Sequence, residues 1–155
     1  IENADKTDFC IGVAGYPEKH FEAPDMKTDL ANLKKKVDAG AHFIITQMFF
    51  DNEAFYRFRD EAVKLGINVP IIPGIKPLYK REHLEVLPRI FHTKIPQQVI
   101  DSISRFNNPD DAYKAGIEAS VAQCNDLLAH GVPGLHFYSM SVAKPTSDVL
   151  MGIRG

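Results

Sequence analysis

The 155-residue sequence has no tryptophan and only two cysteines, Cys10 and Cys124, which lie far apart. Isolated cysteines lack the paired spacing of a metal or redox site. A chain so poor in cysteine suits a reducing compartment, so we expect a cytoplasmic protein. No apolar run is long enough to cross a bilayer and the N-terminus does not resemble a signal peptide. We therefore expect no association with a membrane.

An excess of one charge is also missing. Lysine and arginine total 18 against 20 aspartate and glutamate residues, so the formal net charge is −2. The densest basic run, Lys34 to Lys36, is short and falls within an expected helix, where such runs usually face solvent. We expect no nucleic-acid partner. The length suits one domain, and the first residue is Ile1, which suggests a fragment or a processed product.

Several motifs are absent: a metal-ligand cluster, a nucleophile elbow, a phosphate loop and a Gly-x-Gly-x-x-Gly turn. The last absence disfavours a dinucleotide-binding fold. The sequence does contain one pattern three times: an amphipathic helix followed by a glycine and an apolar run. Gly40, Gly66 and Gly131 suit the left-handed position after a helix. The apolar runs have no polar face, which is typical of buried parallel strands.

The pattern predicts strands near 8–15, 42–49, 69–75 and 134–140. Helices are predicted near 25–39, 52–65, 80–92 and 109–130, with a short helical piece near 96–105. Asp25 is the expected N-cap of the first helix, and Asp51 or Asn52 that of the second. The tail after Tyr138 is expected to be too short for a full final helix.

Repeated βα units predict an α/β fold with a parallel sheet and right-handed crossovers. Four strands are half of an eight-stranded barrel, which typically needs about 250 residues. An open four-stranded sheet with helices on both faces is the alternative. In a barrel, the functional groups lie at the carboxyl ends of the strands.

Gln47 is the most informative residue at these ends, because it is an amide within an apolar strand. A buried amide without partners is costly, so either the protein or a ligand satisfies it. An amide both donates and accepts, which suits a ligand with an amide or pterin edge.

Other polar groups near the strand ends have two interpretations. Tyr16 either stacks on a flat ring or covers the core, and His20 is either a ligand contact or an exposed loop residue. Asp29, Asn32 and Lys36 form a stripe beside the apolar face of the first helix. This stripe either reaches a ligand or forms bonds within the helix. Asp51 is interpreted as a helix cap, and the segment from Pro73 to Pro77 as a tight turn.

Six segments together resemble the catalytic domain of bacterial-type methylenetetrahydrofolate reductases. They are AGYPEKHFEAP, DLANLKKKVDAG, FIITQMFFD, RFRDEAVKLGI, PIIPGI and GLHFY, in order over most of residues 10–140. The family is a flavoprotein with a (β/α)8 TIM barrel that holds FAD at its carboxyl rim. The resemblance implies that residues 1–155 are the C-terminal half of one such FAD-binding barrel domain.

The resemblance also assigns residues. Flavin contacts are implied for Ala14, Tyr16, His20, Asp29, Asn32, Lys35, Lys36 and Ile45. Substrate contacts are implied for Gln47, Leu87 and Tyr138. Lys35 stands where the family often has arginine. Val142 replaces an arginine associated with substrate, and Lys144 is a nearby alternative cation.

The implied reaction reduces 5,10-methylenetetrahydrofolate to 5-methyltetrahydrofolate with NADH or NADPH by a ping-pong mechanism, in one-carbon and methionine metabolism. The family's general acid is a glutamate near the start of the barrel. We therefore assign no catalytic residue in this chain, which alone is not expected to be competent. A homo-oligomer is expected. The alternatives are a non-catalytic half-barrel that binds a partner through open sheet edges, and another flavin- or folate-binding barrel.

Overall fold

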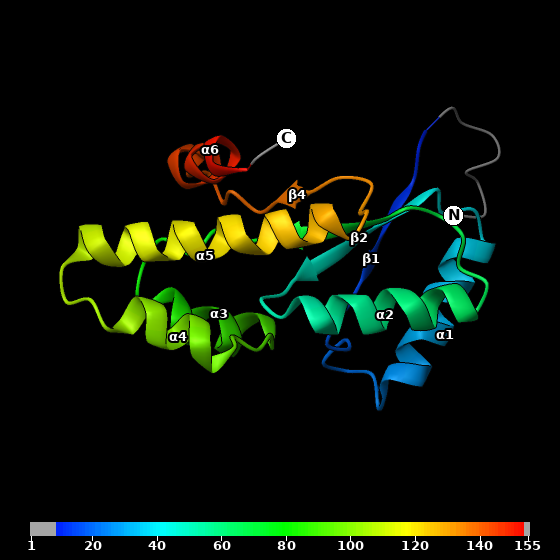
Figure 1. The fold of residues 1–155 in the computed structure, drawn as a ribbon. Helices are drawn as coiled ribbons and strands as arrows, with labels where there is room; N and C mark the ends of the chain where they lie inside the picture. Colours follow the sequence, from blue (N-terminus) through cyan, green and yellow to red (C-terminus); the bar gives the residue numbers. More distant parts are fainter. Residues whose placement is uncertain (1–8, 154–155) are drawn as a thin grey trace.

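The computed structural model describes residues 9–153. Residues 9–153 form four strands and six helices, which alternate along most of the chain (Figure 1). The strands are β1 (Gly12–Gly15), β2 (Phe43–Met48), β3 (Ile71–Ile75) and β4 (His136–Phe137). The helices are α1 (Met26–Asp38), α2 (Asn52–Lys64), α3 (His83–Phe91), α4 (Gln97–Ser104), α5 (Pro109–Ala129) and α6 (Ala143–Gly152).

All four strands form one parallel sheet in the order β1-β2-β3-β4. Each strand therefore pairs with the next one along the chain, which is the arrangement of consecutive strands in a βα barrel. The predicted fold class, four parallel strands of a partial TIM barrel with covering helices, is confirmed. The long helix α5 contacts α2, α4 and α6, so it joins the helices that cover the sheet (Figure 1).

Two groups of buried side chains hold these layers together. The larger group packs the sheet against α1, α2 and α5, with Leu33, Ile44, Phe58 and Leu127 among its members. The smaller group lies where α3, α4 and α5 meet, and its members are Met48, Phe50, Leu78, Leu87, Ile103, Ala112 and Ala115. This second group supports the carboxyl ends of β2 and β3.

The predicted helix ends are confirmed. The Asp25 side chain caps α1 by accepting from the Thr28 N–H at 2.7 Å, and Asp51, not Asn52, caps α2. Gly40, Gly66 and Gly131 follow α1, α2 and α5 with φ of 104°, 78° and 72°. Only glycine takes this conformation without a steric cost, so these three positions end their helices where the sequence indicates.

The end of the chain departs from the prediction in two ways. Strand β4 spans only two residues, because the backbone turns at Met140 and Ser141, which have φ of 49° and 63°. The tail is also long enough for a helix, since α6 runs for ten residues and buries Pro145 and Val149. The expectation of no full final helix was wrong.

The first strand begins later than predicted. Within the described residues β1 starts at Gly12, and Asp8 of the predicted range lies outside them. A substituent at Gly12 would lie 2.4 Å from the Phe43 ring, so the glycine allows β1 and β2 to lie close together. The other predicted strands and helices are present within a few residues of their expected bounds.

Candidate site at the carboxyl ends of the strands

The carboxyl ends of the parallel strands bring distant residues to one rim of the sheet. Tyr16 follows β1, Gln47 is near the end of β2, and Tyr138 follows β4. A small hollow lined by Tyr16, Gln47, Met48, Phe91 and His92, among others, lies at this rim. The structure thus joins two of the predicted contacts, Tyr16 and Gln47, in one place.

The face of the sheet that turns away from the main core offers a flat apolar surface. Ala14 and Ile45 are register partners on β1 and β2, so their side chains lie side by side on one face. Gly15 faces the opposite side, where a side chain would lie 2.8 Å from Phe58. Ala14 is exposed and Ile45 is half-buried. This pair forms a floor on which a planar ring could lie.

Tyr16, His20 and Asp29 lie together beside this floor. The Tyr16 and His20 rings meet edge to face with centroids 4.6 Å apart. The Asp29 carboxylate accepts from the His20 backbone N–H at 2.9 Å, which ties the loop after β1 to helix α1. Burial and, second, the charge of Asp29 raise the pKa of the Tyr16 phenol. The loop histidine is therefore packed and not simply exposed.

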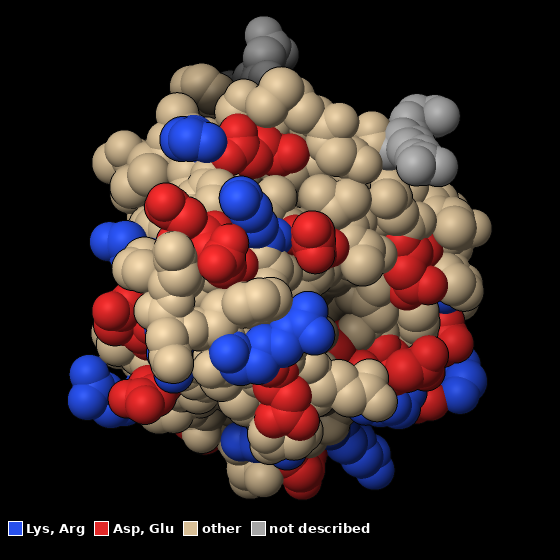
Figure 2. Space-filling model, turned by 60° about the vertical axis from the view of Figure 1, so that its left-hand side comes forward, with Lys and Arg blue, Asp and Glu red and all other residues tan. Residues whose placement is uncertain are grey.

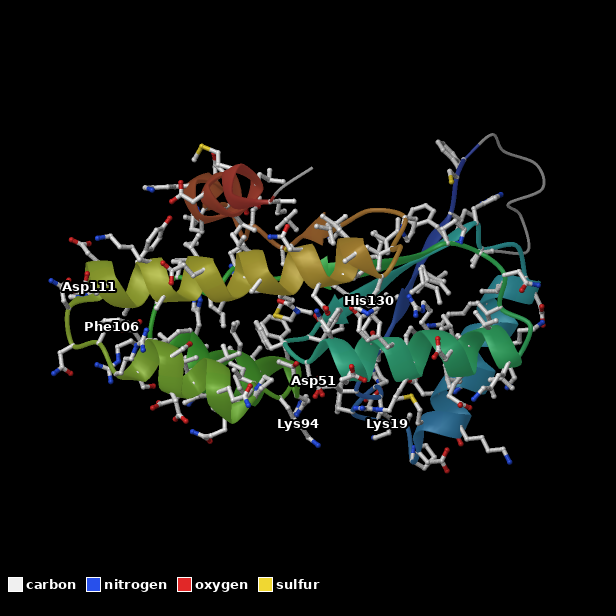
Figure 3. All side chains as sticks on the ribbon, viewed as in Figure 1. Lys19, Asp51, Lys94, Phe106, Asp111 and His130 are labelled. Carbon is white, nitrogen blue, oxygen red and sulfur yellow. The ribbon has the colours of Figure 1, made fainter. Side chains whose placement is uncertain are left out.

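Lys19 stabilises this loop from within. It has a positive φ of 77°, which is uncommon for a residue with a side chain. Its ammonium group donates to the carbonyl oxygens of His20, Phe21 and Ala23 at 3.0, 3.4 and 2.5 Å. These bonds hold the turn that carries His20, and Figure 3 shows Lys19 at this end of the molecule.

The polar stripe on α1 is only partly occupied by contacts within the helix. Lys35 donates to the Asn32 side chain at 3.3 Å, and both residues are exposed. Lys36 is half-buried and forms no ion pair with any described residue. The bond between Lys35 and Asn32 fits the interpretation of a row within the helix. The amide and both ammonium groups nevertheless face solvent or a rim where a ligand could lie.

Gln47 is satisfied at one end of its amide only. Its Oε1 accepts from the Met48 N–H at 2.9 Å. Within residues 9–153 its Nε2 has no hydrogen-bond partner. The protein therefore fixes the orientation of the amide through the oxygen and leaves two N–H donors for a ligand.

Tyr138 reaches from β4 to β2. Its hydroxyl donates to the Thr46 carbonyl oxygen at 2.9 Å, and its ring lies over Gly74 of β3. The pairing of β2 with β3 shifts register between Ile45 and Met48, beside this contact. Burial and, second, the nearby Tyr16 raise the pKa of the Tyr138 phenol. Tyr138 is thus a fixed neighbour of the Tyr16 side of the rim.

Leu87 lies deeper than a direct contact residue. It is 3% exposed and packs in the smaller buried group, beneath the rim. Of the two positions considered near the C-terminus, Val142 carries no charge and Lys144 is paired with Asp148 at 2.6 Å. Lys144 is therefore not a free substitute for an arginine.

Two carboxylates near the rim have structural partners. Glu18 accepts from the Thr93 hydroxyl at 2.6 Å and from the Lys94 N–H at 2.9 Å, which ties the loop after β1 to the segment after α3. Asp51 caps α2 and lies 3.7 Å from Arg57 (Figure 3). Neither carboxylate is placed as a free acid.

Lys76 was missed by the sequence interpretation, which explained its segment as a turn. It directly follows β3 and is 1% exposed. Its Nζ lies 4.9 Å from the centroid of the Tyr79 ring, whose edge meets His83. The signal that could have found it is a lysine placed between a fully apolar strand and a proline.

Charges of both signs are mixed over the face in Figure 2, without a continuous basic or acidic area. Among residues 9–153, no group of three or more metal-ligating side chains comes together. No helix of that part of the chain is both long and apolar enough to span a membrane.

The chain matches a known protein family in sequence. The family model described as "Methylenetetrahydrofolate reductase" matches residues 1–154. The chain is 40% identical to "Methylenetetrahydrofolate reductase (NADH) 1" of Arabidopsis thaliana over 94% of this chain and 26% of that protein. It is 40% identical to "5,10-methylenetetrahydrofolate reductase" of Buchnera aphidicola subsp. Acyrthosiphon pisum, over 92% of this chain and 49% of that protein. The chain thus spans a quarter to a half of these curated relatives.

A solved structure shares the fold. It is an uncharacterised protein from Clostridium thermocellum that binds two copies of 5-methyl-5,6,7,8-tetrahydrofolic acid. The TM-score is 0.65 at 18% identity, and the match covers 94% of this chain and 52% of that one. At this identity the similarity supports the barrel-type fold alone.

Proposed function

Because this chain belongs to the methylenetetrahydrofolate reductase family, we propose that it forms the C-terminal half of an FAD-binding barrel. Within the intact protein, this barrel reduces 5,10-methylenetetrahydrofolate to 5-methyltetrahydrofolate with NADH or NADPH. The names of the relatives support the activity. The place of this activity is one-carbon and methionine metabolism in the cytoplasm.

The described residues fit a flavin. The register pair Ala14 and Ile45 offers a flat apolar floor for a ring system, and Tyr16 and His20 border it. Lys36 supplies a cation for phosphate oxygens. Lys35 supplies a second one when it exchanges its hydrogen bond to Asn32 for a phosphate oxygen. Asn32 supplies an amide for ribose hydroxyls, while Asp29 positions the His20 loop. FAD, when bound, supplies the two-electron redox chemistry that no side chain provides.

The residues that this proposal gives to the substrates are Gln47 and Tyr138, in direct contact, and Leu87, which lies beneath them. Gln47 donates from Nε2 to an acceptor on the pterin or on the nicotinamide carboxamide, while Met48 holds its oxygen. Tyr138, fixed by Thr46, limits how far the bound ring can move. Leu87 shapes the site from beneath. The two substrates use this place in turn, as a ping-pong order requires.

In this proposal, the general acid that protonates the folate is not one of residues 9–153. Glu18 and Asp51 are engaged in holding loops and a helix end, so neither is assigned as the general acid. The single observation that carries the proposal is the free donor end of Gln47 at the same rim as Tyr16 and Tyr138.

Spectroscopy of the intact protein tests the proposal. The purified protein should be yellow, NADH should bleach the flavin absorbance, and methylenetetrahydrofolate should restore it. An intact preparation that never takes up flavin would overturn the proposal. Flavin uptake without reoxidation by methylenetetrahydrofolate would indicate another flavin-binding barrel.

A different class of function is a non-catalytic half-barrel that assembles through its open sheet edges. Both β1 and β4 are edge strands of the described sheet, which favours pairing with further strands. Flavin absorbance of the intact protein, measured on the assembly that light scattering detects, separates the cases. We propose a homo-oligomer that binds flavin, whereas the alternative predicts an assembly that binds none.

A further inference from the structure

Lys76 is a buried charge without a countercharge. Among the residues that the structure describes, it is the one charged side chain in the buried class, at 1% exposed. No carboxylate or hydrogen-bond acceptor within residues 9–153 contacts its ammonium group. Its one described contact is with the face of the Tyr79 ring, 4.9 Å from the centroid. Burial of an unpaired charge is costly, and burial lowers the pKa of Lys76 accordingly.

The surroundings of Lys76 are basic. The His83 ring meets the same Tyr79 ring edge to face at 4.4 Å, and its Nδ1 is buried without a hydrogen-bond partner. Lys80 lies 5.6 Å from the Tyr79 centroid. The nearest carboxylate that acts on His83 is Glu82, which is exposed. Two polar atoms, Lys76 Nζ and His83 Nδ1, therefore lack partners beside one ring.

The position of Lys76 is central to the rim. It follows β3, and β3 lies between β2 and β4 in the sheet. The ends of these neighbours carry Gln47 and Tyr138, the two proposed substrate contacts nearest the rim. An unpaired cation therefore follows the strand that lies between these two strand ends.

We propose that Lys76, together with His83, binds an anionic group of a substrate, with the Tyr79 ring giving way as the anion arrives. The ammonium group then exchanges its contact with the aromatic face for a charge-assisted hydrogen bond. The inference rests on the proposed function, because both of its substrates carry such groups. These anionic groups are the glutamate carboxylates of the folate and the diphosphate of the nicotinamide nucleotide.

The test compares Lys76→Met with Lys80→Met in the intact, flavin-loaded protein. Lys80 contacts the same ring but is exposed, so its variant is the matched control. Dissociation constants are measured separately for 5-methyltetrahydrofolate and for NAD⁺, which carries the same diphosphate but has no hydride to give to the flavin, at low and at high salt. Lys76→Met should weaken one of them tenfold or more at low salt, and less at high salt, while Lys80→Met leaves both within twofold.

The thermal unfolding midpoint of the same variants, measured without substrates, gives a second readout. Removal of a buried unpaired charge should raise the midpoint of Lys76→Met above that of the unaltered protein. A raised midpoint would show that Lys76 destabilises the fold, as expected of a lysine that is kept for binding. If Lys76 were instead paired with a carboxylate elsewhere in the intact protein, its replacement would lower the midpoint.

A ligand without the glutamate identifies the anion. If the carboxylate is bound, 5-methyltetrahydropteroate should bind Lys76→Met and the unaltered protein equally well. If the diphosphate is bound, the loss should appear with NAD⁺ only. Unchanged dissociation constants for both substrates, or a lowered unfolding midpoint, would overturn the inference while the reductase assignment stands. An unaltered protein that binds no flavin overturns both.

Discussion

The hydroxyl of Tyr138 donates to the backbone carbonyl oxygen of Thr46, 2.9 Å away, and so joins β4 to β2 across the strand between them. Gly74 of β3 lies beneath this bridge. Its N–H donates to the Thr46 hydroxyl at 2.9 Å, because the shifted register brings that side chain into the ladder. Three adjacent strands are therefore fixed to one another next to Gln47.

Gly74→Ala should destabilise the protein. The added methyl group would lie 2.2 Å from the Thr46 carbonyl oxygen and 2.6 Å from the Tyr138 ring. Overpacking of this kind costs about 1–3 kcal/mol. Denaturant unfolding should show a lower midpoint with an unchanged slope. Gly134→Ala is the control, because nothing lies within 4 Å of its added methyl group. Equal midpoints for the two variants would contradict the bridge.

Gln47→Glu should weaken folate binding without unfolding the strand end. The glutamate can still accept from the Met48 N–H, but it loses the donors of the amide. A lost hydrogen bond that leaves a buried acceptor costs about 1–3 kcal/mol, or roughly fivefold to 150-fold in affinity. Titration of the flavin-loaded protein with 5-methyltetrahydrofolate measures this, and unfolding measures stability. An unchanged affinity would remove Gln47 from the substrate contacts.

Glu18→Ala should loosen the segment after α3. The Glu18 carboxylate accepts from the Thr93 hydroxyl and the Lys94 N–H, and the methyl side chain of alanine cannot accept a hydrogen bond. Hydrogen exchange at the Lys94 amide should become faster by about tenfold or more, since charged hydrogen bonds contribute about 1.5–3 kcal/mol. Glu22→Ala, an exposed neighbour, is the control. The idea fails if the two variants exchange alike at Lys94.

The stability of the fold should depend on His83 in mild acid. Burial, and next the charges of Lys76 and Lys80, lower the pKa of His83 to about 4, from an unfolded value of 6.5. Between these values the unfolded state binds a proton that the folded state does not. Stability is therefore lost as the pH falls from about 6.5 to about 4, and the penalty is absent above 6.5.

His83→Gln should reduce this loss. The unfolding midpoint is measured for the variant and the unaltered protein from pH 7 to pH 4. It should fall less steeply with falling pH in the variant, since the carboxylates titrate equally in both proteins. An imidazole signal of His83 that titrates near 6.5 by NMR would contradict the depressed pKa.

Most of the sheet and its main helices could be predicted because their signals are local. An apolar run, a glycine after the preceding helix and an aspartate cap identify β2, β3, α1 and α2 without any tertiary information. The sequence after Tyr138 contains none of these local signals. Helix α6 begins after Val142, which provides no side-chain cap, and it forms because Pro145 and Val149 are buried in the fold.

The predicted site residues depend on the resemblance, and the structure adds what distance along the chain conceals. The partner of Glu18 lies 75 residues away, and that of Tyr138 lies 92 residues away. Lys76 is buried in the fold with its ammonium group against the Tyr79 ring. Spacing in a sequence indicates none of these contacts.

The strand order has a consequence for synthesis of the chain. Since each strand hydrogen-bonds to the strand made just before it, every new βα unit finds its docking edge already exposed as it leaves the ribosome. Among the four strands of residues 9–153, none waits for its neighbour in this sheet to be translated later, and the loops closed at each step remain short. The bridge from Tyr138 to Thr46 is the exception, and it can lock three strands only at the last step.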